Sequence, residues 1–193
     1  VSRWRSDLRE SNPSWTPDGR ELAFVRISAD SPATATLMRR PWDGSAPASA
    51  ILTRPAFAGG RGASIGTAAW LADGRSALIQ IVRAGSAPAT GRGPAQPAVQ
   101  TDLMLLSLDA PDSLRPFIVT DFSEGNPALS PDRRLLAYTS NESGRTEVYT
   151  RPIRGGALRQ VSLNGGTQPK WARSGRELFF RNADTIFAAR VTM

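Results

Sequence analysis

One short hairpin pattern occurs four times in the 193-residue sequence, and this repeat restricts the fold more than any other feature. The copies are NPSWTPDGRELAF from Asn12, TAAWLADGRSALI from Thr67, NPALSPDRRLLAY from Asn126 and QPKWARSGRELFF from Gln168. Their starts are separated by 55, 59 and 42 residues. The last spacing is typical of a four-stranded propeller blade, so the repeat predicts an array of similar β units.

Each copy predicts two strands joined by a tight turn. In the first copy, Pro17 presets the first turn dihedral and the glycine that follows Asp18 accepts a positive φ. The strand after the turn, such as residues 22–25, is apolar at consecutive positions, so both of its faces need cover. Sheets stacked face to face around an axis supply that cover. We expect a shared positive φ at the four equivalent turn positions, which are Gly19, Gly74, Arg133 and Gly175.

The third copy gives the complete strand order most clearly. A polar loop at 141–145 follows its hairpin, and a third strand at 147–151 and a fourth at 158–162 come next. The equivalent strands of the first two copies are expected at 37–40, 50–53, 103–106 and 117–119. The sequence therefore predicts an all-β fold, a β-propeller of four-stranded antiparallel blades. The expected blades are 11–54, 66–120, 125–163 and 167–193, the last of them incomplete.

The motifs NPSWTPDGRELAFV, LSPDRRLLAYTSNESGRTEVYTRPI and RQVSLNGGTQPKWARSGRELFFR resemble the WD40-like repeats of TolB-type β-propellers. Residues 129–193 are particularly similar to the C-terminal propeller of bacterial serine/threonine protein kinases. The resemblance implies a periplasmic or extracytoplasmic, non-catalytic interaction or sensor module, with a kinase domain upstream of Val1. Related propellers also gate substrates in prolyl-oligopeptidase-type serine peptidases or occur as free periplasmic TolB-like proteins, and both alternatives stay open.

Four copies fall short of the six to eight blades that the resemblance implies. An incomplete arc of a six-bladed or larger ring, covalently continuous with further blades, is therefore favoured over a closed ring of four. Residues 1–6 are expected to form the outer strand of a preceding blade or to complete the last one. Residues 84–100 are a Pro/Ala/Gly-rich segment, expected to be a flexible insertion, and residues 57–64 lengthen another connection.

The absence of histidine and cysteine excludes much chemistry. Without them the chain has no imidazole or thiolate metal ligand, no histidine base and no disulfide. Residues 62–66, GASIG, match the G-x-S-x-G pattern of hydrolases, but that elbow needs a preceding strand, a following helix and a histidine. We expect a loop between blades at this position. The sequence therefore predicts no catalytic residue, cofactor or metal, and it contains no apolar run long enough to span a membrane.

The net charge of +7 is distributed along the whole chain. Lys170 is the only lysine, and the 23 arginines do not gather in one segment. A nucleic-acid-binding domain usually concentrates its cations on one face, so a protein or small-ligand partner is expected, and nucleic acid is not.

Side chains that recur at one repeat position are expected to stabilise the structure that the blades share. Asp18, Asp73 and Asp132 are interpreted as turn residues that accept a backbone N–H two residues on, in preference to a ring of cation ligands. Inner-strand tryptophans are expected to pack between blades, whereas Trp4 and Trp42 lie outside the pattern and are free for surface contacts. The tryptophans at the repeat position are Trp15, Trp70 and Trp171.

Function is expected where the copies differ. The segments that differ most are the loops at 59–66, 84–100 and 141–145. The last loop contains Asn141-Glu142-Ser143, which matches a glycosylation sequon but is interpreted as a polar hairpin loop.

Overall fold

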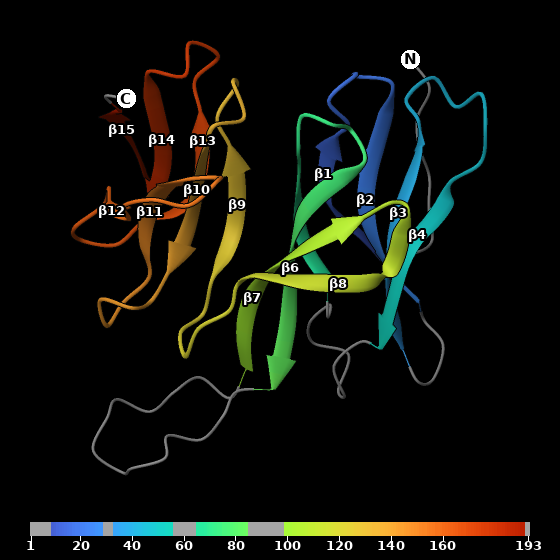
Figure 1. Ribbon diagram of the computed structural model, residues 1–193, viewed down its shortest axis with the longest axis horizontal. Coiled ribbons are helices and arrows are strands. Elements are labelled where there is room, and N and C mark those ends of the chain that lie inside the picture. The colour runs from blue at the N-terminus through green and yellow to red at the C-terminus, as the bar shows by residue number, and fades with distance from the viewer. Residues whose placement is uncertain (1–8, 29–32, 56–64, 85–98, 192–193) are drawn as a thin grey trace.

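The computed structural model describes residues 9–28, 33–55, 65–84 and 99–191, and all regular structure within them is β-strand (Figure 1). The strands form four antiparallel sheets, which we call blades 1 to 4 in chain order. Blade 1 contains β1 (Arg9–Trp15), β2 (Glu21–Ile27), β3 (Thr34–Pro41) and β4 (Ser49–Pro55). Blade 2 contains β5 (Ile65–Trp70), β6 (Ser76–Ala84), β7 (Val99–Ser107) and β8 (Ala110–Ile118). Blade 3 contains β9 (Gly125–Leu129), β10 (Leu135–Ser140), β11 (Glu147–Pro152) and β12 (Arg159–Gln160), and blade 4 contains β13 (Thr167–Trp171), β14 (Glu177–Asn182) and β15 (Thr185–Arg190).

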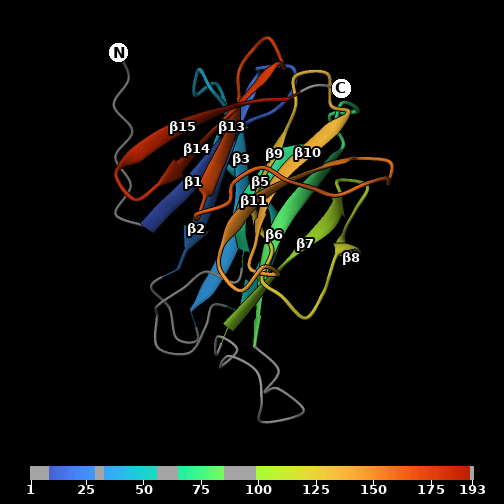
Figure 2. The same cartoon turned by 90° about the vertical axis from the view of Figure 1, so that its left-hand side faces the viewer.

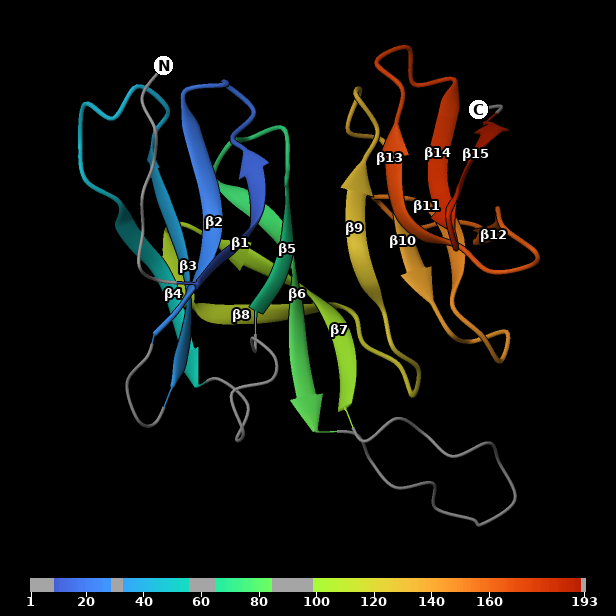
Figure 3. The same ribbon diagram turned by 180° about the vertical axis from the view of Figure 1, so that it is seen from behind.

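Every blade is a simple meander in which consecutive strands pair. Figure 2 displays this order for blade 2, from β5 to β8 at the right-hand side of the view. The first strands of successive blades are neighbours in space, because β1 contacts β5, β5 contacts β9 and β9 contacts β13. Figure 3 shows β5 and β9 near the middle of the molecule, with β4 and β15 toward its two ends. The predicted all-β propeller fold is confirmed.

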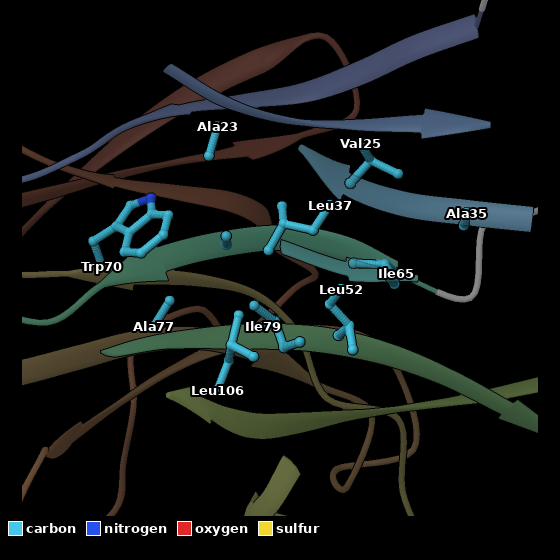
Figure 4. Packing of buried hydrophobic residues seen from close by; sticks show 11 residues of the cluster. Ala23, Val25, Ala35, Leu37, Leu52, Ile65, Trp70, Ala77, Ile79 and Leu106 are labelled. Carbon is cyan, nitrogen blue, oxygen red and sulfur yellow. The ribbon is translucent and has the colours of Figure 1, made fainter. Parts of the chain in front are cut away.

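Hydrophobic clusters fasten each blade to the next. The cluster between blades 1 and 2 includes Val25 and Leu37 on one side and Ile65, Trp70 and Ile79 on the other (Figure 4). Two further clusters join blade 2 to blade 3 and blade 3 to blade 4. Full burial of one such aliphatic side chain stabilises the fold by about 1.5–3 kcal/mol. Within the described residues, no cluster of this kind joins blade 4 to blade 1.

The turns between the first two strands are alike in all four blades. The φ angles of Gly19, Gly74, Arg133 and Gly175 are 68°, 65°, 59° and 69°, so the predicted shared conformation is confirmed even at the arginine. A side-chain oxygen accepts the backbone N–H two residues on in each turn. The oxygens belong to Asp18, Asp73, Asp132 and Ser174, at N–O distances of 3.1, 2.9, 3.1 and 3.3 Å. The predicted turn role of the three aspartates is therefore confirmed.

An irregularity that the repeat did not predict interrupts all four inner strands. In β1 the register shifts between Ser11 and Ser14, so that Asn12 and Pro13 together oppose a single residue of β2. Equivalent shifts occur in β5, β9 and β13. This is a β-bulge, and proline suits it because proline has no N–H to lose from the ladder. The residues before the three bulge prolines adopt a left-handed conformation, with φ of 54° at Asn12, 49° at Asn126 and 52° at Gln168.

Several sequence predictions fall outside the described residues. These are the outer strand at 1–6, the loop at 57–64 and most of the flexible insertion at 84–100. Trp4 and the first three residues of the GASIG segment are also outside them. No helix in the described ranges has the length and apolar character to cross a membrane.

Arg133 provides a test of backbone strain at the turn. A non-glycine residue in the left-handed region costs about 1 kcal/mol, but the Arg133 guanidinium also donates to the carbonyl oxygen of Trp70. We therefore compare two variants that both lack this hydrogen bond. Arg133→Gly should be more stable than Arg133→Ala by about 1 kcal/mol, a difference of about 2–4 °C in thermal unfolding.

Gly19→Ala is the matched control for this comparison. An added Cβ at Gly19 meets no atom within 4 Å, so its cost comes from φ alone and should be similar, about 1 kcal/mol. Equal stability of Arg133→Gly and Arg133→Ala would contradict the assignment of strain.

Candidate functional site

The inner strands enclose a groove at the centre of the propeller. Two cavities of about 720 and 650 Å³ meet there, and Pro13, Pro127 and Lys170 line both of them. We call this region the axial groove. Its walls are residues 12–15, 68–70, 126–131 and 168–171, together with Arg133, Arg173, residues 179–181 and Ile186. All four blades therefore contribute to one concave surface, as is typical of ligand sites.

The bulges place amide side chains and prolines along the groove. Asn12, Asn126 and Gln168 line it from three blades, each followed by a proline. Asn126 is fixed on both sides, because its backbone N–H donates to Gln80 Oε1 at 3.1 Å and its Nδ2 donates to Thr139 Oγ1 at 3.3 Å. The bulge of blade 3 is thus held in place within the groove.

Gln80 holds the bulges of blades 2 and 3 together. Its side chain lies against Gly66 of blade 2 and Gly125 of blade 3, where an added Cβ would come within 3.0 Å of it. These glycines allow the close approach of strands that the sequence alone did not explain.

The groove carries positive charge without carboxylates. Arg133, Lys170, Arg173 and Arg181 line it, and its walls, within the described residues, include no aspartate or glutamate. Arg181 is paired with Asp184, at 3.5 Å between Nη2 and Oδ1, whereas the seven ion pairs found among the described residues do not involve the other three cations. Lys170 and Arg173 are exposed, so their charges face the solvent of the groove.

The tryptophans at the repeat position differ in environment. Trp70 is only 2% exposed and packs against blade 1, as predicted. Trp171 is half-buried against blade 3, and its Nε1 donates to the carbonyl oxygen of Ala128 at 3.0 Å. The prediction of buried packing is wrong for Trp15, which is 55% exposed because no described blade lies on that side of β1. Trp42 is exposed, as expected for a residue outside the pattern.

A buried carboxylate fixes the connection that leaves blade 3. Glu147 is fully buried and accepts hydrogen bonds from Arg145 Nε at 2.7 Å, from the backbone N–H of Gly165 at 2.9 Å and from the Ser162 hydroxyl. Burial alone raises its pKa, but the hydrogen bonds from Ser162 and Gly165 outweigh burial and hold the pKa below the ordinary value. The charge is thus used within the frame.

Near the corresponding connection of blade 2 lie two acids with fewer donors, Glu124 in the connection itself and Asp102 on β7. Glu124 is 1% exposed, and its Oε1 accepts from Thr120 Oγ1 at 2.5 Å. Asp102 pairs with Arg83, at 2.5 Å between Oδ2 and Nε. Within the described part of the chain, Glu124 Oε2 and Asp102 Oδ1 have no hydrogen-bond partner. Burial, and then the charge of Asp102, raise the pKa of Glu124 to about 7.

The loop at 141–145 lies between β10 and β11 and has a structural role at its first residue. Asn141 Oδ1 accepts the backbone N–H of Ser123 at 2.7 Å, and the Asn141 carbonyl oxygen accepts the N–H of Gly144 at 2.9 Å. These bonds support the interpretation of the sequon as a polar hairpin loop. The bulges and groove cations were not singled out from sequence, although a proline inside a strand is a recognisable signal for a bulge.

No family model matches the sequence. The chain is 40% identical over 67 residues to tricorn protease homolog 2 of Streptomyces coelicolor, a match that covers 35% of this chain and 6% of that protein. TolB from Acinetobacter baumannii has a similar structure, with a TM-score of 0.66, 13% identity, and coverage of 97% of this chain and 42% of TolB. A puromycin-hydrolyzing peptidase of Mycobacterium tuberculosis gives a TM-score of 0.56 and 18% identity over 90% of this chain and 28% of the peptidase.

The chain thus spans less than half of each of these relatives. At these identities the structural matches show the fold, and that fold is a TolB-like β-propeller.

The buried acid of blade 2 predicts a pH dependence of stability. Because its pKa is about 7 in the folded state and 4.5 for the unperturbed side chain, folded Glu124 keeps a proton that the unfolded chain has released. The contribution of the protonated Glu124 to the free energy of unfolding is fully present below pH 4.5 and is lost as the pH rises through 7. The loss is roughly 3 kcal/mol by linkage.

Glu124→Gln keeps the shape and an oxygen that accepts from Thr120 but cannot ionise, so it should remove this loss and be more stable than the parent chain at pH 8. Urea unfolding between pH 5 and pH 8 measures the effect, and Glu177→Gln on blade 4 is the matched control. Parallel pH curves for the parent chain and Glu124→Gln would contradict the prediction.

Proposed function

We propose that this chain is a non-catalytic interaction or sensor module that recognises its partner through the axial groove. The observation that carries the proposal is the convergence of all four inner strands on one groove with unpaired cations. Rigid strands fix the positions of these side chains, which suits recognition.

The hydroxyl groups near the groove support a binding role over catalysis. Ser130 lines the groove, but its Oγ donates to Asp132 at 2.6 Å and accepts the backbone N–H of Leu135 at 2.9 Å. Ser14 also lines the groove, yet the sequence has no histidine that would act as its base.

We also propose that this module is an arc of a larger ring. Ile186 on blade 4 is 74% exposed, whereas the equivalent side chains of the other blades are covered by the next blade. Those side chains are Leu37, Leu103 and Val148, with exposures of 1%, 0% and 0%. Trp15 is likewise exposed where Trp70 is covered. A further blade on each side would bury both surfaces, in keeping with the 42% of TolB that the chain covers.

The parent protein is proposed to be a bacterial serine/threonine kinase that carries this module outside the cytoplasm, as the resemblance of residues 129–193 implies. A second candidate is the substrate-gating propeller of a serine peptidase. The specific observation in its favour is the 40% identity over 67 residues to a tricorn protease homolog. A free periplasmic TolB-like protein is the third candidate, supported by the TolB fold.

Turnover assays test the non-catalytic role. The purified chain should be inert toward peptidase and esterase substrates, because its sequence has no histidine base for a serine nucleophile, and toward kinase substrates, because it has no Walker loop for a nucleotide. Ser64→Ala is the control for the GASIG segment. Hydrolysis by the parent chain that Ser64→Ala abolishes would make the chain an enzyme and overturn the proposal.

Two matched substitutions test the open face of blade 4. In this chain Ile186→Asp should change the free energy of unfolding by less than about 0.5 kcal/mol, because the side chain is already in water. Val148→Asp places a carboxylate at the equivalent covered position and should cost more than about 3 kcal/mol. Chemical unfolding measures both. In a longer chain that includes the next blade, Ile186→Asp should become as costly as Val148→Asp, and a neutral result there would contradict the larger ring.

A further inference from the structure

Three cations of the axial groove, Arg133, Lys170 and Arg173, occupy positions at which the other blades carry small, glycine or proline residues. Lys170 aligns with Ser14, Ala69 and Ala128, because each pairs with the residue two places after the start of the second strand. The register thus shows that blade 4 alone presents a cation from this position of the inner strand. Lys170 is also the only lysine of the chain.

Arg173 and Arg133 depart from the repeat in the same way. Arg173 stands two residues after Trp171, where the other three blades have Pro17, Ala72 and Pro131. Arg133 stands at the turn position that is glycine in the other three blades, and it retains the left-handed φ of 59°. A strained backbone at Arg133 lowers the stability of the blade, and such strain tends to occur at functional sites.

We propose that Arg133, Lys170 and Arg173 form a recognition site for an acidic peptide segment, an inference that rests on the proposed role of the groove in binding. All three line the same cavity of about 650 Å³, none is in an ion pair among the described residues, and no carboxylate lines that cavity. Carboxylates of a ligand would supply the missing counter-charges as charge-assisted hydrogen bonds.

The remaining walls favour a peptide over nucleic acid. Around the cations the cavity is lined by prolines, alanines, tryptophans, Leu129 and two serines, a largely apolar surface that suits an extended chain. A nucleic-acid strand needs exposed aromatic faces for base stacking. Three tryptophans line the cavity, and two of them are used in blade packing, because Trp70 is 2% exposed and Trp171 packs against blade 3. Trp15 is exposed, but the proposed preceding blade covers it.

Fluorescence anisotropy with defined probes tests the site. The probes are a labelled octapeptide of alternating Glu and Ala, the same peptide with Gln in place of Glu, and labelled octathymidylate. The acidic peptide should bind at least tenfold more tightly than the Gln peptide, and its affinity should fall as salt is raised from 50 to 300 mM.

The variants take residues from the repeat itself. Lys170→Ala and Arg173→Pro copy Ala128 and Pro131 of blade 3, so they are compatible with the fold, and thermal unfolding confirms that each is folded. Each should weaken the acidic peptide at least fivefold. Arg154→Ala and Arg159→Ala remove the same charge from exposed positions outside the groove walls and should leave binding unchanged.

Each contrary result has a distinct meaning. Equal binding of both peptides that is still lost in Lys170→Ala would overturn the acidic preference and leave the recognition role intact. Equal weakening by Arg154→Ala would show an effect of net charge only, and tighter binding of octathymidylate would replace the peptide with nucleic acid; both overturn the inference. Absence of binding by every probe to the folded chain also overturns it, whereas the proposed non-catalytic role fails only on turnover.

Discussion

The contact between the faces of adjacent blades is the interaction on which the rest of the structure depends. Each second strand is apolar at consecutive positions, so a single blade in water would expose two apolar faces. Alternate residues of the strand point to opposite faces, so one set packs against the preceding blade and the other against the following blade. In blade 3, Leu136 and Tyr138 pack against blade 2, while Ala137 packs toward blade 4. Stability is thus shared between neighbours, and the inner strands are held around the axis as a consequence.

The packing of adjacent blades also determines which positions can differ between the four copies. The turns, bulges and covered faces must remain alike for adjacent blades to fit, so differences between copies are tolerated in the loops and on the surface of the groove. The groove cations illustrate this division, because Lys170 and Arg173 replace small residues or proline without disturbing strand pairing. Arg133 is the exception, because it occupies a turn that the blades share, and the turn keeps its geometry in spite of the arginine side chain.

Sequence patterns were sufficient for those parts of the fold that depend on neighbours along the chain. Turn chemistry at Asp18 and its equivalents and the strand order follow from local residue types. The exposure of Trp15 did not follow, because it depends on which blade lies beside β1. The raised pKa of Glu124 was equally inaccessible, since Asp102 approaches it only after two strands have folded. The axial groove could not be predicted either, because it forms only where the inner strands of all four blades face one axis.

The bulges also determine how a ligand can be held along the axis. Strands that line a channel usually offer a free edge of N–H and C=O groups to which an extended peptide can add as another strand. Here a proline removes an N–H from β1, β9 and β13, and the left-handed residue before it turns the edge out of line. Main-chain pairing is thereby hindered at three of the four inner strands. A ligand in this channel is therefore selected mainly by side chains, so its identity can change by substitution at a few positions without any change to the sheets.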